Sequence, residues 1–401
     1  MIAPGSTHAS MAELNRSRII QLLHHNGVCS RAHIARQLGL TPAAITKITA
    51  QLIDMGVVSE TGNLDGIKKR RSIGLQINES KYRVIGVKFA RTLVRIGVFD
   101  LGGNLESEQL LPPVAIGSIR NTLDDVKRRI DAILDADGSI VAIGMAVPGP
   151  YLRDEGRIAV VTSMVEWRDV NFIDEFADAF RVPAFIEQDA RAGALAQSLF
   201  GDGANPRSLG YYLIGEGVGL GLIDDGELVN GNLGAATEIG HVSIDIHGRP
   251  CECGNVGCLE NYCSAVSLHR AIIDGGLVDG AEGMTHTAAC AALFRRAEDG
   301  DEKALALVRE FARYIGYGCV TIINAYNPAQ IILGDIMAQA GPMLLDEVKA
   351  VVERHALSAL RDTTAITISD LPVDATLSGA AAVAAAQFLE HPTEFVGRPD
   401  D

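Results

Sequence analysis

A single segment of the chain reads His241-Val-Ser-Ile-Asp-Ile-His-Gly-Arg-Pro-Cys251-Glu-Cys253-Gly-Asn-Val-Gly-Cys258-Leu-Glu260. Four such side chains, three thiolates and one imidazole, are a common tetrahedral ligand set for structural zinc. Gly254 and Gly257 let the backbone turn tightly around an ion. The spacing therefore predicts a structural Zn²⁺ site formed by His241, Cys251, Cys253 and Cys258. His247 is a rival imidazole that the spacing alone does not exclude.

The same segment carries a family resemblance. Glu238-Ile-Gly-His241, followed by Cys-x-Cys-Gly-x-x-Gly-Cys-Leu-Glu260, resembles the signature of the ROK family of bacterial repressors, open reading frames and sugar kinases. The resemblance extends from about residue 12 to about residue 388. It implies an α/β protein whose body has an actin-like, ribonuclease-H-like, two-lobed sugar-kinase fold.

Composition sets limits on the class of protein. A chain of 401 residues is long enough for two or three domains. It has no apolar stretch of about 20 residues, so we expect no membrane insertion. The N-terminus shows no signal-peptide pattern. Seven cysteines, three of them in one loop, favour metal binding in a reducing compartment over disulfides. We therefore expect a cytoplasmic protein.

Charge is distributed unevenly along the chain. The net charge is −15, yet residues 1–80 contain nine Lys or Arg and five acidic residues, which gives +4. The remainder of the chain therefore carries −19. A small basic head on an acidic body is typical of a nucleic-acid-binding module joined to another domain.

Residues 1–80 have the pattern of a helix-turn-helix. Apolar residues at helical spacing predict helices over about 13–25, 31–38 and 42–55, and Thr41-Pro42 is a helix-start signal. We expect the third helix to enter the major groove of DNA. Its outward residues are predicted to be Thr41, Ala43, Ala44, Thr46 and Lys47, with Thr49 as a further candidate.

Two short β-rich segments follow, 57–60 and 72–77, and they enclose the basic run 68–71. This pattern predicts a winged helix whose wing reaches phosphates or a narrow minor groove. The predicted contacts in the wing are Lys69, Arg70 and Arg71. The alternative is a module for protein contacts, with the basic run merely solvated.

Residues 81–390 are predicted to form the two-lobed effector domain, followed by a tail over 391–401. Each lobe begins with a β-rich segment, at 81–100 and at 209–223. The main predicted helices cover 122–136, 171–180, 191–200, 301–327, 342–356 and 379–389.

The resemblance also bears on catalysis. ROK kinases have Asp-x-Gly-Gly-Thr in the first hairpin, whereas this chain has Lys88-Phe89-Ala90-Arg91-Thr92. A lysine replaces the acid on the metal side, and both glycines have gained side chains. In the second Gly-rich turn, Glu216 stands where the kinases usually have Thr. A carboxylate there would repel phosphate, so we expect no intact ATP site and no kinase activity.

The sugar site of the family is better preserved. Glu187-Gln188-Asp189-Ala190-Arg191 occupies the position of the family's Glu-Asn-Asp-x-Asn. The resemblance implies a sugar or sugar-phosphate effector bound by Gln188, Asp189, Glu238, His241 and Glu260. We expect Arg191 to point outward from its helix, although it could instead contact an anionic sugar. Trp167 could pack on a sugar face or belong to the core.

These patterns predict a DNA-binding transcriptional regulator, a repressor of carbohydrate-utilisation genes. Its partners would be operator DNA, a sugar effector and further copies of itself, as a homodimer or homotetramer. The alternative is an ATP-dependent ROK-type sugar kinase with an accessory DNA-binding head. A sugar-responsive hub that binds a transport protein is a third possibility.

Overall fold

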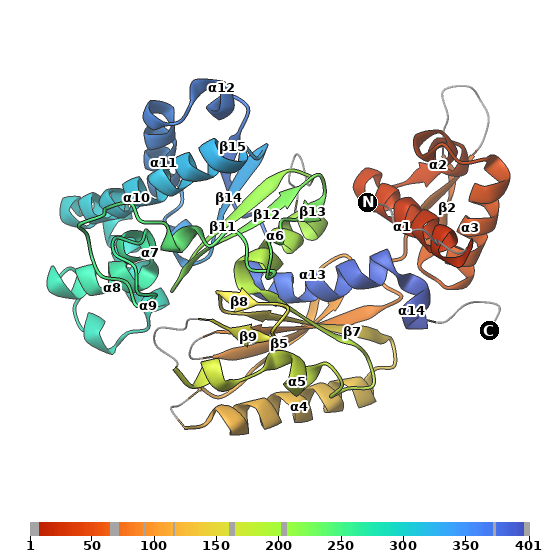
Figure 1. Cartoon of the computed structure of the whole chain (residues 1–401), viewed down its shortest axis with the longest axis horizontal. Coiled ribbons are helices and arrows are strands. Elements are labelled where there is room, and N and C mark those ends of the chain that lie inside the picture. The colour runs from red at the N-terminus through yellow and green to blue at the C-terminus, as the bar shows by residue number, and fades with distance from the viewer. Residues whose placement is uncertain are drawn as a thin grey trace.

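The computed structural model describes residues 8–64, 72–90, 93–114, 117–159, 165–201, 207–371 and 374–396. An N-terminal head is attached to a body of two lobes, each built on a five-stranded sheet (Figure 1). The α/β class expected from the sequence is confirmed. Within the described ranges, no helix is both long and apolar enough to cross a membrane.

The head is a winged helix. Its helices are α1 (His8–Asn26), α2 (Arg31–Leu38) and α3 (Pro42–Asp54). Its strands β1 (Cys29–Ser30), β2 (Val58–Leu64) and β3 (Ser72–Ile77) pair antiparallel in the order β1-β3-β2. Ser30 and Thr41 cap α2 and α3, because each hydroxyl accepts a hydrogen bond from a backbone N–H in the first turn. Gly39 ends α2 with a φ of 65°, in the left-handed region.

The first lobe is built on a mixed sheet. Its strands, in the spatial order β10-β7-β4-β5-β6, are β10 (Ala184–Gln188), β7 (Ile140–Val147), β4 (Arg83–Phe89), β5 (Val94–Asp100) and β6 (Leu105–Leu110). Helices α4 (Ile119–Ala136) and α5 (Phe172–Phe176) pack on its outer face. The lobe also contains β8 (Tyr151–Leu152), β9 (Arg157–Ile158) and the 3₁₀ turn η1 (Val165–Asp169).

The second lobe is also built on a five-stranded sheet, and it contains more helices than the first. Its sheet has the order β13-β12-β11-β14-β15, formed by β13 (Glu227–Leu228), β12 (Val218–Asp224), β11 (Leu209–Ile214), β14 (Gln330–Gly334) and β15 (Ala365–Ile368). The helices are α7 (Glu260–Cys263), α8 (Ala265–Asp274), α9 (His286–Glu298), α10 (Glu302–Tyr326), α11 (Pro342–His355) and α12 (Ser358–Arg361). The 3₁₀ turns are η2 (Ile239–His241), η3 (Ala281–Gly283) and η4 (Ile336–Ala340).

Two helices, α6 (Asp189–Phe200) and α13 (Ala375–Glu390), lie between the two sheets (Figure 1). α13 packs on β4 and β7 of the first lobe, and α6 packs on β11 and β12 of the second. The two helices approach closely, since a Cβ at Gly379 would lie 2.5 Å from the carbonyl carbon of Ala192. The alanines of α13 both favour a helix and let its backbone reach a strand. Close contacts between glycine and alanine residues of α6 and α13 therefore hold the two lobes together.

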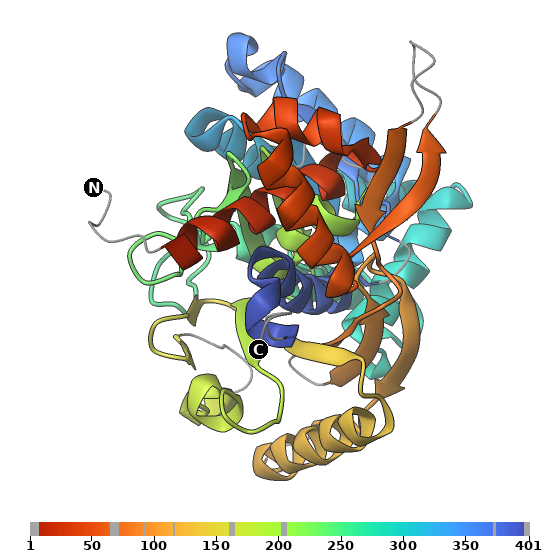
Figure 2. The same ribbon diagram turned by 90° about the vertical axis from the view of Figure 1, so that its right-hand side faces the viewer.

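The head and the body share one hydrophobic cluster. It joins residues of α1, α3 and β3 to Leu377, Phe388 and Leu389 of α13, and Figure 2 shows the head above the end of this helix. Tyr82 donates a hydrogen bond to the carbonyl of Met55. The head is therefore packed against the body.

The expected tail, 391–401, contains a short helix. Residues Pro392–Val396 form helix α14, and residues 397–401 lie outside the described ranges. Phe395 packs against Phe185 and Phe388, and the backbone N–H of Thr393 donates to Glu13 of the head. Helix α14 is thus part of the contact between head and body, because Phe395 buries apolar surface there.

The close packing of α13 yields a test. A Cβ at Gly144 of β7 would overlap the carbonyl oxygen of Ala380 and lie 2.9 Å from the backbone nitrogen of Ala384. We expect Gly144→Ala to lower the free energy of unfolding by about 3 kcal/mol, because strand and helix must move apart. Gly138→Ala, where a Cβ meets nothing within 4 Å, is the matched control. Urea unfolding compares the two, and equal midpoints would contradict the packing argument.

Candidate functional site

One imidazole and three thiols converge in the loop between η2 and α7. The side-chain donor atoms of His241, Cys251, Cys253 and Cys258 all lie within 4.8 Å of one another. Tight backbone turns bring them together: Cys251 donates its N–H to Asn255, and Gly254 and Gly257 have φ of 92° and 73°. A Cβ at Gly257 would overlap the carbonyl oxygen of Asp245, so this position requires glycine.

The distances in this group test its fit to a metal. The Sγ atoms of Cys253 and Cys258 are 3.7 Å apart, and Nδ1 of His241 is 3.8 Å from Sγ of Cys251. Zn–S bonds of about 2.3 Å place two thiolates of a tetrahedron about 3.8 Å apart. The cluster can therefore hold a metal ion. Among the described residues, the clustered imidazole is His241 and not the exposed His247.

A pocket of about 470 Å³ lies between the lobes beside this cluster. Its walls come from both sheets and from the first turns of α6 and α13. All five residues expected to bind the effector line it, namely Gln188, Asp189, Glu238, His241 and Glu260. His241 belongs to both the pocket and the cysteine cluster, so the state of the cluster bears directly on the shape of the pocket.

The local fold positions these side chains. Gln188 is the N-cap of α6, since its side-chain oxygen accepts a hydrogen bond from the N–H of Arg191 at 3.0 Å. Asp189 begins the helix and accepts from the N–H of Ala190. Glu260 begins α7 and accepts from the N–H of Val218 at 2.9 Å. Hydrogen bonds to the backbone thus hold these three side chains at the pocket.

Glu238 differs from its neighbours in charge state. Burial, together with the carboxylates of Asp189 and Glu260, raises the pKa of Glu238 to about 8. At neutral pH this side chain therefore carries a proton and can donate a hydrogen bond, whereas an ionised carboxylate can only accept. Three acidic groups of the pocket thus offer both donors and acceptors to hydroxyl groups of a ligand.

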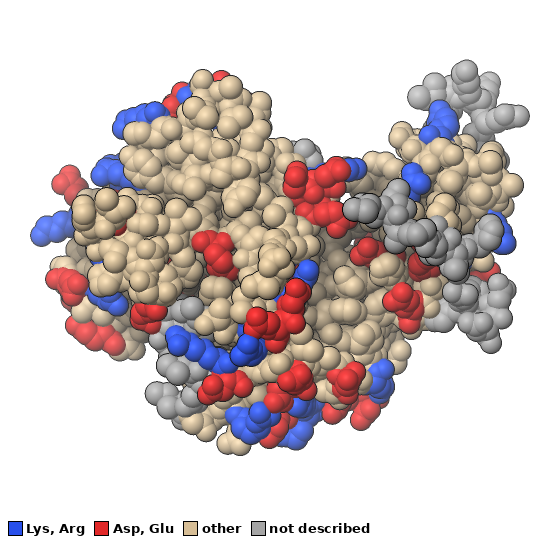
Figure 3. Space-filling view, viewed as in Figure 1, with Lys and Arg blue, Asp and Glu red and all other residues tan. Residues whose placement is uncertain are grey.

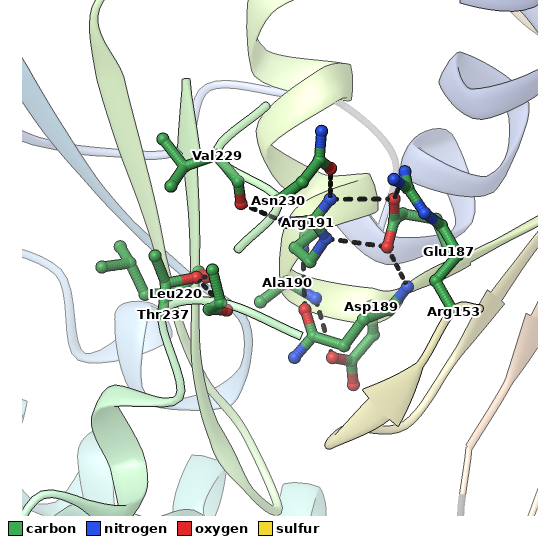
Figure 4. A network of polar contacts seen from close by, with 11 residues as sticks. Arg153, Glu187, Asp189, Ala190, Arg191, Leu220, Val229, Asn230 and Thr237 are labelled. Atoms are coloured by element: carbon green, nitrogen blue, oxygen red, sulfur yellow. Dashed lines mark hydrogen bonds and ion pairs between the residues drawn. The ribbon is translucent and has the colours of Figure 1, made fainter. Parts of the chain in front are cut away.

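The expectation that Arg191 points outward is wrong. Its side chain is 1% exposed and forms an ion pair with Glu187, with Nε to Oε1 at 2.8 Å. It also donates to the carbonyl of Val229 and to the side chain of Asn230 (Figure 4). Glu187 lies near the end of strand β10 and Arg191 lies in the first turn of α6, so the passage from strand to helix brings the two charges together inside the protein. Arg191 supports the pocket wall and is absent from its lining.

Lys88, which the resemblance aligns with the acid of the kinases, is part of a charge network. Its Nζ lies 2.6 Å from Oδ2 of Asp374, the N-cap of α13. Arg95 contacts the same oxygen at 3.3 Å and pairs with Glu108. Burial acts to lower the pKa of Lys88, but Asp374 and Asp335 outweigh it and the net shift is upward. The lysine is thus held as a cation.

The structure describes only some of the other residues that the resemblance aligns with the phosphate motif. Ala90 and Glu216 line the pocket, as does Asp335, while Arg91 lies outside the described residues. Asp374 also lines the pocket, and neither Asp335 nor Asp374 is among the site residues expected from the sequence. Asp374 could have been recognised as the helix cap before the alanine-rich segment. Trp167 is buried against Phe89 and Phe172 and belongs to the core.

The predicted recognition helix presents its polar side to solvent. Thr41, Ala43, Thr46 and Lys47 are exposed, and Ala44 is half-buried. Thr49 does not join them, because its side chain is buried, donates to the carbonyl of Ile45 and accepts from Arg31. The wing residues Lys69, Arg70 and Arg71 lie outside the described residues. In Figure 3 acidic and basic side chains are both spread over the body, and the outer part of the head shows basic ones.

Relatives of the chain share this organisation. The xylose repressor of Caldicellulosiruptor bescii is 25% identical over 399 residues, which cover 96% of this chain and 98% of the relative. The DNA-binding transcriptional dual regulator NagC of Escherichia coli K12 is 26% identical over 371 residues, with 90% and 89% covered. Both relatives match the head as well as the body.

Solved structures agree with the observed fold. A ROK family transcriptional regulator, described as a homolog of the E. coli MLC protein, superposes with a TM-score of 0.77 at 26% identity and covers 96% of this chain and 99% of its own. A ROK family glucokinase from Streptomyces griseus, in complex with glucose and AMPPNP, covers 75% of this chain and 99% of its own, with a TM-score of 0.64 at 27% identity.

Two family models match successive parts of the sequence. A winged helix-turn-helix DNA-binding model matches residues 13–59, within the head. The model described as the ROK family matches residues 84–387, which make up most of the chain. Together with the observed two-lobed body, this match shows that the chain belongs to the ROK family.

Proposed function

We propose that this protein is a DNA-binding transcriptional regulator, a repressor of carbohydrate-utilisation genes, with a sugar or sugar phosphate as effector. The observation that carries the proposal is the fusion of a winged helix, with its recognition helix exposed, to a body whose pocket contains Asp189, Glu238 and Glu260. Relatives named as repressors over nearly the whole chain support it. The site of action would be the cytoplasm, where thiols stay reduced.

The cluster of His241, Cys251, Cys253 and Cys258 would bind structural zinc. The ion would supply four strong bonds that tie the loop together. His241 and Glu260 border both the loop and the pocket, so this chain's own residues link metal binding to the shape of the effector site. Gln188, Asp189 and Glu238 would complete the contacts to sugar hydroxyls.

Helix α13 offers a route from the pocket to the head. Its first turn, at Asp374 and Thr376, borders the pocket, and its last turns, at Phe388 and Leu389, lie in the hydrophobic cluster shared with the head. A ligand that shifts the first turn would therefore alter the support of the recognition helix. Effector and DNA would then weaken each other's binding by linkage.

Operator recognition would require more than one copy of the chain. One recognition helix reads only a half-site, so we expect a homodimer or homotetramer with symmetric heads. The contacts would come from the exposed residues of α3 and from Lys69, Arg70 and Arg71 of the wing.

The alternative is a sugar kinase with an accessory head, which the acid Asp189 in the pocket favours. Phosphoryl transfer requires backbone N–H groups and a metal to hold the phosphates. Here Lys88 occupies the position of the acid and is paired with Asp374, while Glu216 and Asp335 bring negative charge to the same side of the pocket. We therefore favour an effector pocket without ATP chemistry.

DNA binding is tested with fluorescence anisotropy on DNA from upstream of the protein's own gene. We expect Lys47→Ala to weaken binding similarly on specific and random DNA and to lower the salt dependence by about one ion, because a lysine ammonium neutralises one phosphate. Lys303→Ala, an exposed lysine on the body, is the control. An equal loss of DNA affinity in both variants would contradict a role for α3 in DNA binding.

The metal site is tested by Cys253→Ala. We expect this variant to lose bound zinc, measured by elemental analysis, and to lose its response to the effector, because the loop that carries His241 and Glu260 is no longer held. His247→Ala should keep both, since that imidazole lies outside the cluster. Sugar-dependent release of DNA by a zinc-free Cys253→Ala protein would contradict the proposed link.

The effector site is tested by Asp189→Asn. We expect DNA affinity to persist and the effect of sugar to disappear, because the neutral amide is a weaker acceptor for sugar hydroxyls. Asp178→Asn, on the exposed surface of the first lobe, serves as the control. ATP turnover is measured with the same sugars, and turnover by the unaltered protein that Asp189→Asn abolishes would establish the kinase instead.

A further inference from the structure

We propose that the pocket accepts unphosphorylated sugars and excludes sugar phosphates. This inference rests on the proposed function, since it names the class of ligand for the same pocket. It follows from three features of the lining residues: the balance of charge, the pairing of the cations, and the use of the backbone N–H groups.

The first feature is the balance of charge. The acidic side chains that line the pocket come from both lobes and are Asp189, Glu216, Glu238, Glu260, Asp335 and Asp374. The cationic ones are Lys88 and Arg95. A phosphate monoester carries close to two negative charges at neutral pH. Even with Glu238 protonated, carboxylates outnumber the cations, so the pocket repels this group.

The second feature is that the cations already have partners. Lys88 is 2.6 Å from Asp374, and Arg95 is 2.5 Å from Glu108 and 3.3 Å from Asp374. A phosphate could use either cation only by displacing a carboxylate from it. The displaced carboxylate would remain beside the phosphate, which makes the exchange unfavourable.

The third feature concerns the helix N-termini, which commonly bind phosphate. Two helices begin at this pocket, and two N–H groups in the first turn of each already donate to side chains. Asp374 accepts from Thr376 and Leu377 of α13. At α6, Gln188 accepts from Arg191, and Asp189 accepts from Ala190.

The Gly-rich turn before β12 shows the same arrangement. The N–H of Val218 donates to Glu260 at 2.9 Å. A carboxylate of the protein thus occupies a backbone donor that a phosphate would otherwise use. Hydroxyl groups need no such donors, because they can donate to the carboxylates themselves. The pocket is therefore suited to an uncharged polyol.

The test is calorimetric titration of the full-length, metal-loaded protein at fixed salt. Xylose, glucose, mannose and N-acetylglucosamine are each compared with their phosphate monoester. We expect at least one free sugar to bind and its phosphate ester to bind at least roughly tenfold more weakly, which is about 1.4 kcal/mol. A phosphate ester that binds as tightly as its parent sugar would overturn the inference and leave the sensor function standing. Failure of every sugar and every ester to bind would reject the sensor function itself.

A second arm does not depend on the identity of the sugar. Inorganic phosphate is titrated into the unaltered protein and into a Glu216→Gln, Asp335→Asn double variant. We expect the double variant to bind phosphate roughly tenfold more tightly, since two negative charges leave the pocket. The control removes the same two charges from exposed positions, with Glu298→Gln and Asp279→Asn. Equal phosphate affinity in all three proteins would overturn the electrostatic argument.

Discussion

The close approach of helices α6 and α13 between the two sheets is the constraint on which the rest of the structure depends. Glycine or alanine lies at the main contacts in this stack, from Gly144 in β7, through Gly379 in α13, to Gly221 in β12. Dense packing without side-chain bulk lets both helices begin at the same place, between the lobes. Because their first turns converge there, the pocket forms where two helix N-termini and two sheets meet.

This convergence places the partial positive charges of two helix N-termini side by side, and side chains of the protein compensate them. Two helix N-termini attract negative charge, and in this protein Asp374, Gln188 and Asp189 occupy them from within the chain. Lys88 then balances Asp374 and Asp335. The helix N-termini at the pocket are thus compensated from within the chain, which suits recognition of hydroxyl groups better than binding of phosphates. The same helix α13 continues to the head, so the chemistry at one end can influence the packing at the other.

Periodicity predicted the longer helices well. α10 spans Glu302–Tyr326 where 301–327 was expected, and α11 spans Pro342–His355 where 342–356 was expected. Asp301 caps α10, α11 begins with a proline, and each helix has an apolar stripe. The helix expected over 379–389 was predicted too short, since α13 spans Ala375–Glu390. α5 was predicted too long, because the packing of Phe176 is not visible in the local pattern. Arg191 was expected in solvent, because its ion pair with Glu187 is not visible there either.

The sequence by itself determined the three clustered thiols, the helix-turn-helix and the candidate residues of the pocket, because each depends on spacing within a short segment or on a family motif. The tertiary structure placed His241, and not His247, beside the thiols. Only the tertiary structure decided that Lys88 and Asp374, 286 residues apart, form an ion pair, that Arg191 is buried, and that α13 contacts both pocket and head. Such contacts join segments distant in the chain, and their energies depend on burial and on charged neighbours, which sequence spacing does not specify.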